Sequence, residues 1–364
     1  MTIHDRIVLE NKIMDDIIIR SYLRYPKSTI QDLLKLVYQA SFGGGHMIDD
    51  STKSLAFLQE ESKHLQTQKN PDELLYEYIS HDTVRINLRP YMEYHFDLTY
   101  LNDVFVQSAN EKHKDETTFK KYLEYLKGLF KNKLINLDYE QALSTISEYE
   151  ASGVLPLHHS KEYIEAYHPA YRVINKRFIT QEMKEKQIER FVTSVQDKDK
   201  RLVLAIEGKS CSGKSYLSNY LKTTINASVI TTDDFFLTDE QKETQTAIGD
   251  YIDYKLLETE VMSEIRNASS VTYHRYDCHE KKYELKTTKL TQVAIIEGVY
   301  SYNKHLTKYY DYLIFVDVTH EEQNRRLRER NSGAILEKFI NEWIPKENLY
   351  FKTFNILGIA DVII

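Results

Sequence analysis

The chain is poor in the residues that cross-link or interrupt ordinary folds, with 2 cysteines, 6 prolines and 11 glycines among 364 residues. The two cysteines, Cys211 and Cys278, are too few for a disulfide framework and match no zinc-binding spacing. The scarce glycines and prolines stand mostly between regular segments, without any repeat or low-complexity tract. We therefore expect a reducing compartment, the cytoplasm.

Long hydrophobic runs are also missing, so the sequence predicts neither a transmembrane helix nor a signal peptide. The composition is that of a globular protein, with 41% hydrophobic and 28% charged residues. The net charge of -7 argues against a broad surface for nucleic acid or anionic membranes. A chain of this length exceeds one compact core of usual size, which predicts two domains.

What the sequence does contain is a phosphate-binding loop. An apolar run at residues 202–206 has the length of a buried strand. The pattern that follows it is Gly208-x-x-x-x-Gly213-Lys214-Ser215. The two glycines let the backbone curl so that successive N–H groups point at phosphate oxygens. The lysine supplies a positive charge for the β- and γ-phosphates, and the serine hydroxyl can bind Mg²⁺.

The residues around this loop have the order that the motif requires. An amphipathic stretch with Leu217, Tyr220 and Leu221 predicts a helix whose positive end faces the anion. An isolated match can be an ordinary glycine-containing turn, but here a strand precedes the loop and a helix follows it. We expect ATP or GTP to bind at Gly208, Lys209, Ser210, Cys211, Ser212, Gly213, Lys214, Ser215 and Tyr216.

Before residue 195 the apolar residues recur with helical spacing almost throughout. One predicted face comprises Ile30, Leu33, Leu34 and Val37, a second Phe119, Tyr122, Leu123, Leu126 and Phe130, and a third Ala142, Leu143, Ile146 and Tyr149. Asp138 is the expected cap of the third helix. A polar helix over residues 180–194 then reaches the charged stretch 196–200, our predicted domain boundary. Residues 1–195 are thus a mainly helical domain, and residues 196–364 a second domain.

After the boundary, short apolar runs alternate with helical segments. The runs lie at residues 202–206, 228–231, 270–273, 293–296 and 312–316. This alternation is typical of βαβ units, which build a parallel sheet with helices on both faces. The predicted fold class is therefore α/β for the second domain, preceded by the mainly α-helical domain.

Four further segments follow the predicted strands: residues 231–236 (Thr-Thr-Asp-Asp-Phe-Phe), 273–277 (Tyr-His-Arg-Tyr-Asp), 295–300 (Ile-Ile-Glu-Gly-Val-Tyr) and 324–330 (Asn-Arg-Arg-Leu-Arg-Glu-Arg). With the phosphate loop, they resemble the uridine kinase and pantothenate kinase branch of P-loop kinases, over about residues 200–364. These kinases share an Asp-x-Phe segment, a later Glu-Gly and an arginine-rich lid. The resemblance implies an α/β P-loop kinase domain. Residues 249–254 lack the proline of the family's ribose-binding pattern, which leaves the acceptor open.

The resemblance also implies roles for the matching acids. In this family the acid before x-Phe takes the proton of the acceptor hydroxyl, which assigns the general base to Asp233, with Asp234 as the second candidate. Ser215 and Glu297 are the expected metal-side pair, Glu297 acting through coordinated water. Taken alone, an Asp-Asp pair is more often a turn or a helix cap.

The expected cations over the phosphates are Lys214 and the lid arginines. The lid contains Arg325, Arg326, Arg328 and Arg330. Arg326 and Arg330 share one helix face, and we assign these two, with Lys214 and Asp233, to catalysis. An arginine-rich helix that is only a solvated surface is the alternative interpretation.

Residues 1–195 resemble no family that we recognise, but they contain three polar motifs, at residues 42–46, 85–91 and 157–172. Their basic residues are His46, Arg85, Arg89, His168 and Arg172. A pocket for an anionic or hydroxylated ligand is one interpretation, and a helix-to-helix turn with satisfied core histidines is the simpler one. No pair has zinc-ligand spacing. The role predicted for this half is acceptor binding or regulation.

The predicted function is that of an ATP-dependent kinase, which moves the γ-phosphate to a hydroxyl of a small metabolite, with a nucleoside such as uridine as the nearest analogy. ATP and Mg²⁺ are the expected cofactors, and a homo-oligomer is compatible with the sequence. Two alternatives stay open: a nucleotide-binding regulator with little turnover, and a kinase of a larger acceptor. Asp233 favours the kinase, since a regulator needs no carboxylate at the γ-phosphate.

Overall fold

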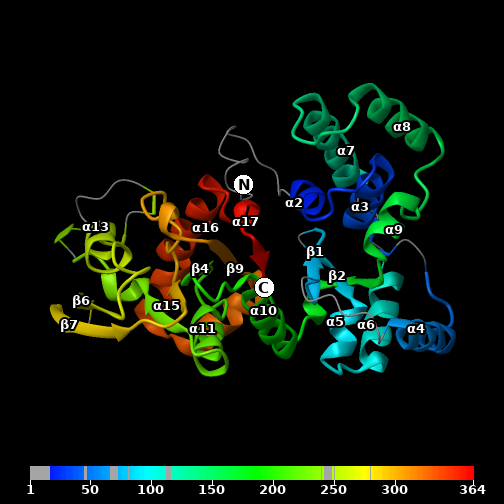
Figure 1. The fold of residues 1–364 in the computed structure, drawn as a ribbon. Coiled ribbons are helices and arrows are strands. Elements are labelled where there is room, and N and C mark those ends of the chain that lie inside the picture. Colours follow the sequence, from blue (N-terminus) through cyan, green and yellow to red (C-terminus); the bar gives the residue numbers. More distant parts are fainter. Residues whose placement is uncertain are drawn as a thin grey trace. The chain divides into compact units, whose positions relative to one another are not determined.

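The computed structural model describes residues 17–44, 47–65, 73–80, 82–111, 116–238, 240–241, 248–249, 251–278 and 280–364. The chain divides into two compact units, Met1–Gln187 and Ile188–Ile364 (Figure 1). The division lies inside helix α10 (Gln181–Val195), whereas the sequence placed the boundary at residues 195 and 196. The last turns of α10 carry Ile188, Phe191 and Val192, which are buried in the second unit.

The first unit has a helical core, as predicted. Its helices are α2 (Ile17–Arg24), α3 (Ile30–Phe42), α7 (Glu116–Lys131) and α8 (Tyr139–Ala151). The predicted faces of α3 and α7 are buried, and most of the predicted α8 face is buried with them, in one apolar cluster. Asp138 caps α8 by accepting a hydrogen bond from the Gln141 amide at 2.7 Å, which confirms the predicted start of that helix.

A small antiparallel sheet in the first unit was not predicted. Its strands, in the order β1-β2-β3, are β1 (Tyr76–Tyr78), β2 (Thr83–Asn87) and β3 (Tyr171–Asn175). Helices α4 (Ser51–Leu65), α5 (Leu88–Glu93), α6 (Leu98–Asn110) and α9 (Lys161–Tyr167) and the 3-10 turn η1 (Lys176–Phe178) complete this unit. The strands are too short for alternation to stand out between helices, so the sequence showed only helical periodicity.

The second unit is built on a five-stranded parallel sheet in the order β10-β9-β4-β8-β5. Its strands are β4 (Leu202–Gly208), β5 (Ser228–Thr231), β8 (Val293–Glu297), β9 (Tyr312–Val316) and β10 (Val362–Ile363). Four of the five predicted strands are confirmed here, and the α/β fold class with them. The apolar run 202–206 is 0–4% exposed, as expected for the central strand of a sheet covered on both faces.

The prediction that residues 270–273 form a strand of the parallel sheet is wrong. These residues are part of β6 (Ser270–Asp277), which pairs antiparallel with β7 (Lys282–Lys289) in a separate two-stranded ribbon. Buried residues such as Val271 and Tyr273 alternate with exposed ones in β6, so only one of its faces is covered. A strand inside the parallel sheet would have to be apolar on both faces. The fifth strand of the parallel sheet is instead β10, which lies at one edge and pairs with β9.

Helices flank this sheet. They are α11 (Lys214–Thr224), α13 (Tyr254–Leu257), α14 (His320–Arg330), α15 (Gly333–Lys338), α16 (Ile344–Thr353) and α17 (Ile356–Ile359). Shorter turns are η2 (Thr232–Phe235), η3 (Glu258–Met262), η4 (Thr307–Tyr309) and η5 (Phe339–Trp343). Both cysteines are free thiols. In the part of the chain that the structure describes, no helix has the length and apolar character to cross a bilayer.

Candidate active site

The phosphate loop lies between the central strand β4 and helix α11, at the carboxyl edge of the sheet where such folds bind ligands. Gly208 has φ 149°, and a Cβ there would lie 2.4 Å from the Val316 carbonyl oxygen. Gly213 has φ 108° and begins α11, while Cys211 has φ 60°. Glycine is thus needed at both positions of the motif, because a side chain would meet β9 at the first and a strained backbone at the second.

Lys214 curls back over the loop that it follows. Its ammonium group donates hydrogen bonds to the carbonyl oxygens of Gly208 and Lys209, at 2.8 and 2.9 Å. No side chain caps the first turn of α11, so its N–H groups point at the space inside the loop. The buried Ser212 hydroxyl also has no hydrogen-bond partner among the described residues. This donor-rich cradle fits an anion of several oxygens, such as a polyphosphate.

Ser215 and Glu297 lie together beside this cradle. The serine hydroxyl is 3.2 and 3.3 Å from the two carboxylate oxygens of Glu297, at the end of β8. Burial raises the pKa of Glu297, Lys214 opposes the shift, and the charge of Asp233 adds to it. The residue after Glu297 must be a glycine, because a Cβ at Gly298 would lie 1.9 Å from the Thr232 hydroxyl oxygen. A hydroxyl and a carboxylate side by side are oxygen ligands of the kind that Mg²⁺ takes.

Asp233 lies in turn η2, just after strand β5, and is exposed as a residue. The Asp233 amide donates a hydrogen bond to the Thr231 hydroxyl at 3.2 Å, which fixes the turn. Its carboxyl group is nevertheless surrounded closely enough that desolvation raises its pKa, with Lys214 and Arg330 opposing the shift and Asp234 adding to it. The sheet therefore brings Asp233 within electrostatic reach of Lys214 and Glu297.

Asp234 has different surroundings from its neighbour. It is 6% exposed and accepts hydrogen bonds from the Tyr273 hydroxyl at 2.9 Å and from the Lys286 ammonium group at 2.7 Å. Both partners belong to the β6–β7 ribbon. These two donors hold the Asp234 carboxylate against the ribbon. Asp234 thus anchors the ribbon to η2.

The lid arginines of α14 divide into two groups. Arg326 donates to the carbonyl oxygens of Cys211 and Ser212 at 3.1 and 3.2 Å, so it reaches the phosphate loop itself. Arg330 acts on Asp233 through its charge. Arg325 instead pairs with Glu322 and Glu329 on the exposed side of the helix. The face shared by Arg326 and Arg330 is therefore the face turned toward the loop.

Two buried acids beside the loop were missed by the sequence reasoning. Glu347, from α16, accepts a hydrogen bond from the Ser210 amide at 3.0 Å and another from the Ser210 hydroxyl. Glu207 accepts from the amides of Gly208, Tyr300 and Tyr302 at 3.0–3.2 Å, and burial raises its pKa to about 7. A charged residue at the end of an apolar strand was a signal for Glu207, whereas Glu347 lies in no motif.

Most of the basic residues that the sequence analysis named in the first unit form ion pairs or hydrogen bonds within that unit. Arg89 pairs with Glu73 and donates to the His168 carbonyl oxygen, and Arg172 pairs with Glu61. His168 ends α9 in a left-handed conformation. Gly45 and His46 lie outside the described residues. Within the described ranges no group of three or more His, Cys, Asp or Glu side chains forms a metal site.

The sheet order, the glycine-built loop and helix α11 define Ile188–Ile364 as an α/β unit of the P-loop class. No family model and no curated protein matches the chain. Solved structures similar to it include a possible uridine kinase from Bacillus stearothermophilus, with 21% identity, a TM-score of 0.42, and coverage of 50% of this chain and 99% of that one.

Two further solved structures are similar over a comparable share of the chain. A protein described as a fructose transport system kinase from a Silicibacter species has 21% identity and a TM-score of 0.35, covering 48% of this chain and 95% of that one. A D-glycerate 3-kinase from Cryptococcus neoformans has 17% identity and a TM-score of 0.29, covering 44% and 84%. A uridine kinase-like protein, the resemblance expected from the sequence, is thus among the similar structures over about half of the chain.

Proposed function

We propose that this protein is an ATP-dependent phosphotransferase that moves the γ-phosphoryl group to a hydroxyl of a small metabolite, with a nucleoside as the nearest analogy. The observation that carries the proposal is the position of Asp233. Its carboxyl group is within electrostatic reach of Lys214, the phosphate-loop cation, and of Arg330 on the lid helix. A site that only held a nucleotide would need the cations and the loop amides but no such base.

In this proposal the chain's own groups divide the work. The loop amides and Lys214 hold the triphosphate, and Arg326 and Arg330 stabilise the charge that moves during transfer. Asp233 accepts the proton of the acceptor hydroxyl while the acceptor oxygen bonds to the γ-phosphorus and the bond to the ADP oxygen breaks. Ser215 and Glu297 would hold Mg²⁺, which when bound spreads the negative charge of the phosphates.

A specific contact favours the second candidate, a nucleotide-binding regulator. Glu347 occupies the Ser210 amide, which belongs to the phosphate loop, and burial raises the pKa of this carboxyl against the hydrogen bonds from Ser210. A loop held in this way has one donor fewer for a ligand. A kinase of a larger acceptor has no such support, since the chain's net charge is -7 and offers no general attraction for a polyanionic chain.

The test is ATP consumption against a panel of hydroxylated metabolites, nucleosides included. We expect one acceptor class to stimulate ADP release, and that stimulation to vanish in Asp233→Asn. ADP release that no acceptor increases would support the regulator instead, and acceptor-stimulated release that survives in Asp233→Asn would show that Asp233 is not the base.

We further propose that the first unit serves acceptor recognition or gating of the kinase site. The supporting observation is that Arg85, His159 and Tyr171 come from motifs that the sequence left without a role and lie in one polar cluster with residues of α3, as described below. Residues 188–364, which keep the α10 residues of the second unit's core, should bind ATP but lose acceptor phosphorylation. Full acceptor phosphorylation by this fragment would make the first unit a separate module.

A further inference from the structure

Arg85, on strand β2 of the first unit, is a buried guanidinium group that forms no ion pair with any described residue. The residue is 3% exposed. Its Nε and Nη2 atoms donate to one neutral acceptor, the Gln39 amide oxygen, at 3.2 and 2.7 Å. No carboxylate of the described residues lies within 4.0 Å of it, and its Nη1 atom donates no hydrogen bond to any of them. Burying a charge in this way is costly unless something compensates it.

The neighbouring arginines show that this unit normally pairs its buried cations. Arg89, four residues further along the chain, is 7% exposed at its side chain and pairs with Glu73 at 3.2 Å. Arg172, on the adjacent strand β3, pairs with Glu61 at 2.7 Å. Of these three arginines, Arg85 is the most deeply buried, and its partners among the described residues are the Gln39 amide oxygen and the Tyr171 ring, 4.7 Å from its central carbon.

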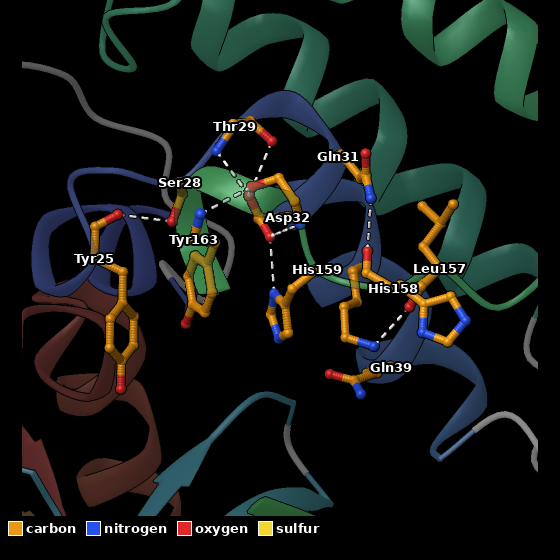
Figure 2. Close-up of polar contacts among 12 residues, drawn as sticks. Tyr25, Ser28, Thr29, Gln31, Asp32, Gln39, Leu157, His158, His159 and Tyr163 are labelled. Atoms are coloured by element: carbon orange, nitrogen blue, oxygen red, sulfur yellow. Dashed lines mark hydrogen bonds and ion pairs between the residues drawn. The ribbon is translucent and has the colours of Figure 1, made fainter. Parts of the chain in front are cut away.

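Asp32, which His159 links to Tyr171 in this region, is not available to Arg85. Thr29, Ser160 and His159 donate to its carboxylate at 2.6–3.0 Å, as Figure 2 shows for Thr29 and His159. Burial works against its ionisation, but these hydrogen bonds prevail and lower its pKa. Asp32 therefore stays ionised, with its charge already satisfied by donors other than Arg85.

His159 links Asp32 to Tyr171 by hydrogen bonds and is itself neutral. Burial lowers its pKa to about 4, although Asp32 opposes the shift. With the Nδ1 proton given to Asp32 at 2.8 Å, the Nε2 atom accepts a hydrogen bond from the Tyr171 hydroxyl at 2.6 Å. The imidazole ring also stacks on Tyr163, with ring centroids 4.2 Å apart. Neither ring supplies a negative charge to the arginine.

A second cation adds to the imbalance. Lys35, one turn before Gln39 on α3, donates to the Leu157 carbonyl oxygen at 2.6 Å. Burial lowers the pKa of Lys35 to about 8, and the charge of Arg85 adds to this shift. The remaining acid that acts on Arg85 is Glu77, which is held by the Tyr25 hydroxyl at 2.7 Å and by Arg24 at 3.6 Å. The cluster thus carries more positive than negative charge.

We propose that Arg85, Gln39 and Lys35 form a binding site for an oxyanion, a phosphate or carboxylate group of a small metabolite. We call Lys35, Gln39, Arg85, His159 and Tyr171 the Arg85 cluster. The free donors are Nη1 of Arg85 and the amide nitrogen of Gln39, which donates to no described residue. A guanidinium group with an adjacent amide matches the planar arrangement of a phosphate or carboxylate. The segments that form the cluster carry the polar motifs that the kinase site leaves unused.

The test uses the full chain in a Lys214→Ala background, so that the phosphate loop does not capture the probe. Inorganic phosphate and malonate are titrated calorimetrically, and the stronger of the two identifies the ligand group as phosphate or carboxylate. We expect saturable binding that weakens at least tenfold on adding Arg85→Gln and is unchanged on adding Arg172→Gln, the matched paired arginine. Binding of neither probe, or equal loss in both variants, would overturn the proposal.

A measurement without any probe guards against a folding defect. If Arg85 awaits a ligand, Arg85→Gln removes a buried charge that no described carboxylate pairs directly, and leaves the melting temperature of the anion-free protein unchanged or higher. A lower melting temperature would make Arg85 a structural residue and overturn the site. Arg85→Lys keeps the charge but loses the planar fork, so it should fold and bind the preferred probe several-fold more weakly. Unchanged binding by Arg85→Lys contradicts recognition by the guanidinium group.

Discussion

The phosphate-loop site and the Arg85 cluster differ in the sign of the charge that their side chains leave uncompensated. At the loop, the pKa values of Asp233, Glu297 and Glu347 are all raised by burial, and one lysine, Lys214, opposes all three shifts. In the first unit, donors satisfy Asp32, while no described carboxylate pairs directly with Arg85. An excess of acids around a phosphate cradle suits a polyanion that arrives with a metal cation. An excess of cations suits an anion alone.

The largest expected effect comes from removing the cation that the loop acids share. Lys214→Ala should abolish turnover and weaken ATP binding, because the lysine serves the ligand and its removal leaves three acids facing the phosphates. The fold should persist, since the ammonium group contacts only loop carbonyls. Calorimetric titration with ATP checks the binding, and circular dichroism checks the fold. Unchanged ATP affinity would refute the nucleotide site.

The next effect separates the two adjacent aspartates. Asp233→Asn should lower turnover by roughly two to four orders of magnitude, the usual contribution of general base catalysis, with ATP binding little changed. Asp234→Asn should reduce turnover less and instead loosen the β6–β7 ribbon, because Tyr273 and Lys286 then share a neutral amide oxygen in place of a carboxylate. Steady-state rates and hydrogen exchange in the ribbon distinguish the two. A larger loss of turnover in Asp234→Asn would make that residue the base.

Acidification should move the stability of the two units in opposite directions. His159 has its pKa lowered from 6.5 to about 4, so the unfolded state binds its proton first, and the first unit loses stability as pH falls from 6.5 toward 4. That gap corresponds to on the order of 3 kcal/mol. Glu207 has its pKa raised to about 7, so the second unit gains stability as pH falls from 7 toward 4.5.

Hydrogen exchange, read separately for each unit between pH 7 and 4, measures this difference. His159→Asn keeps a donor for Asp32 and removes the titrating ring, so it should flatten the response of the first unit alone. Parallel loss of protection in both units would show that the buried groups do not control the response.

The smallest effect is a pair of opposite shifts in the acid limb of the rate profile. Asp234 raises the pKa of Asp233 and Arg330 lowers it. The acid limb of kcat, where Asp233 becomes protonated, should therefore move to lower pH in Asp234→Asn and to higher pH in Arg330→Gln. Shifts of the same sign in both variants would exclude Asp233 as the group that titrates.

The phosphate-loop half could be predicted because its signals are contiguous. The run 202–206 is apolar on every residue, which only a doubly covered strand requires, and the loop motif follows without a gap. Gly208 and Gly298 mark positions where a side chain would meet Val316 or Thr232. The alternating strand β6 has the same length scale, but its one covered face places it outside the sheet.

The Arg85 cluster could not be predicted in the same way. His159 and Asp32 are 127 residues apart in sequence, and Arg85 and Gln39 are 46 apart. No sequence pattern distinguishes Arg85 from the other basic residues of this unit. Their partners in the structure do: Arg89 and Arg172 pair with acids, whereas Arg85 donates to an amide oxygen. The contacts that distinguish Asp233 from Asp234 are likewise encoded by no local pattern, since Tyr273 and Lys286 lie 39 and 52 residues from Asp234.

The strand order also determines how long β4 stays unpaired while the chain is being synthesised. Strand β4 pairs with β8 and β9, and about 85 residues separate the end of β4 from the start of β8. At roughly 5 to 20 residues per second, a ribosome needs roughly 4 to 17 s to make that stretch. During this interval β4, which is buried along its whole length in the folded protein, has left or is leaving the ribosome without its neighbouring strands. Chaperones that hold short apolar segments would have their main opportunity here, before the nucleotide-binding edge exists.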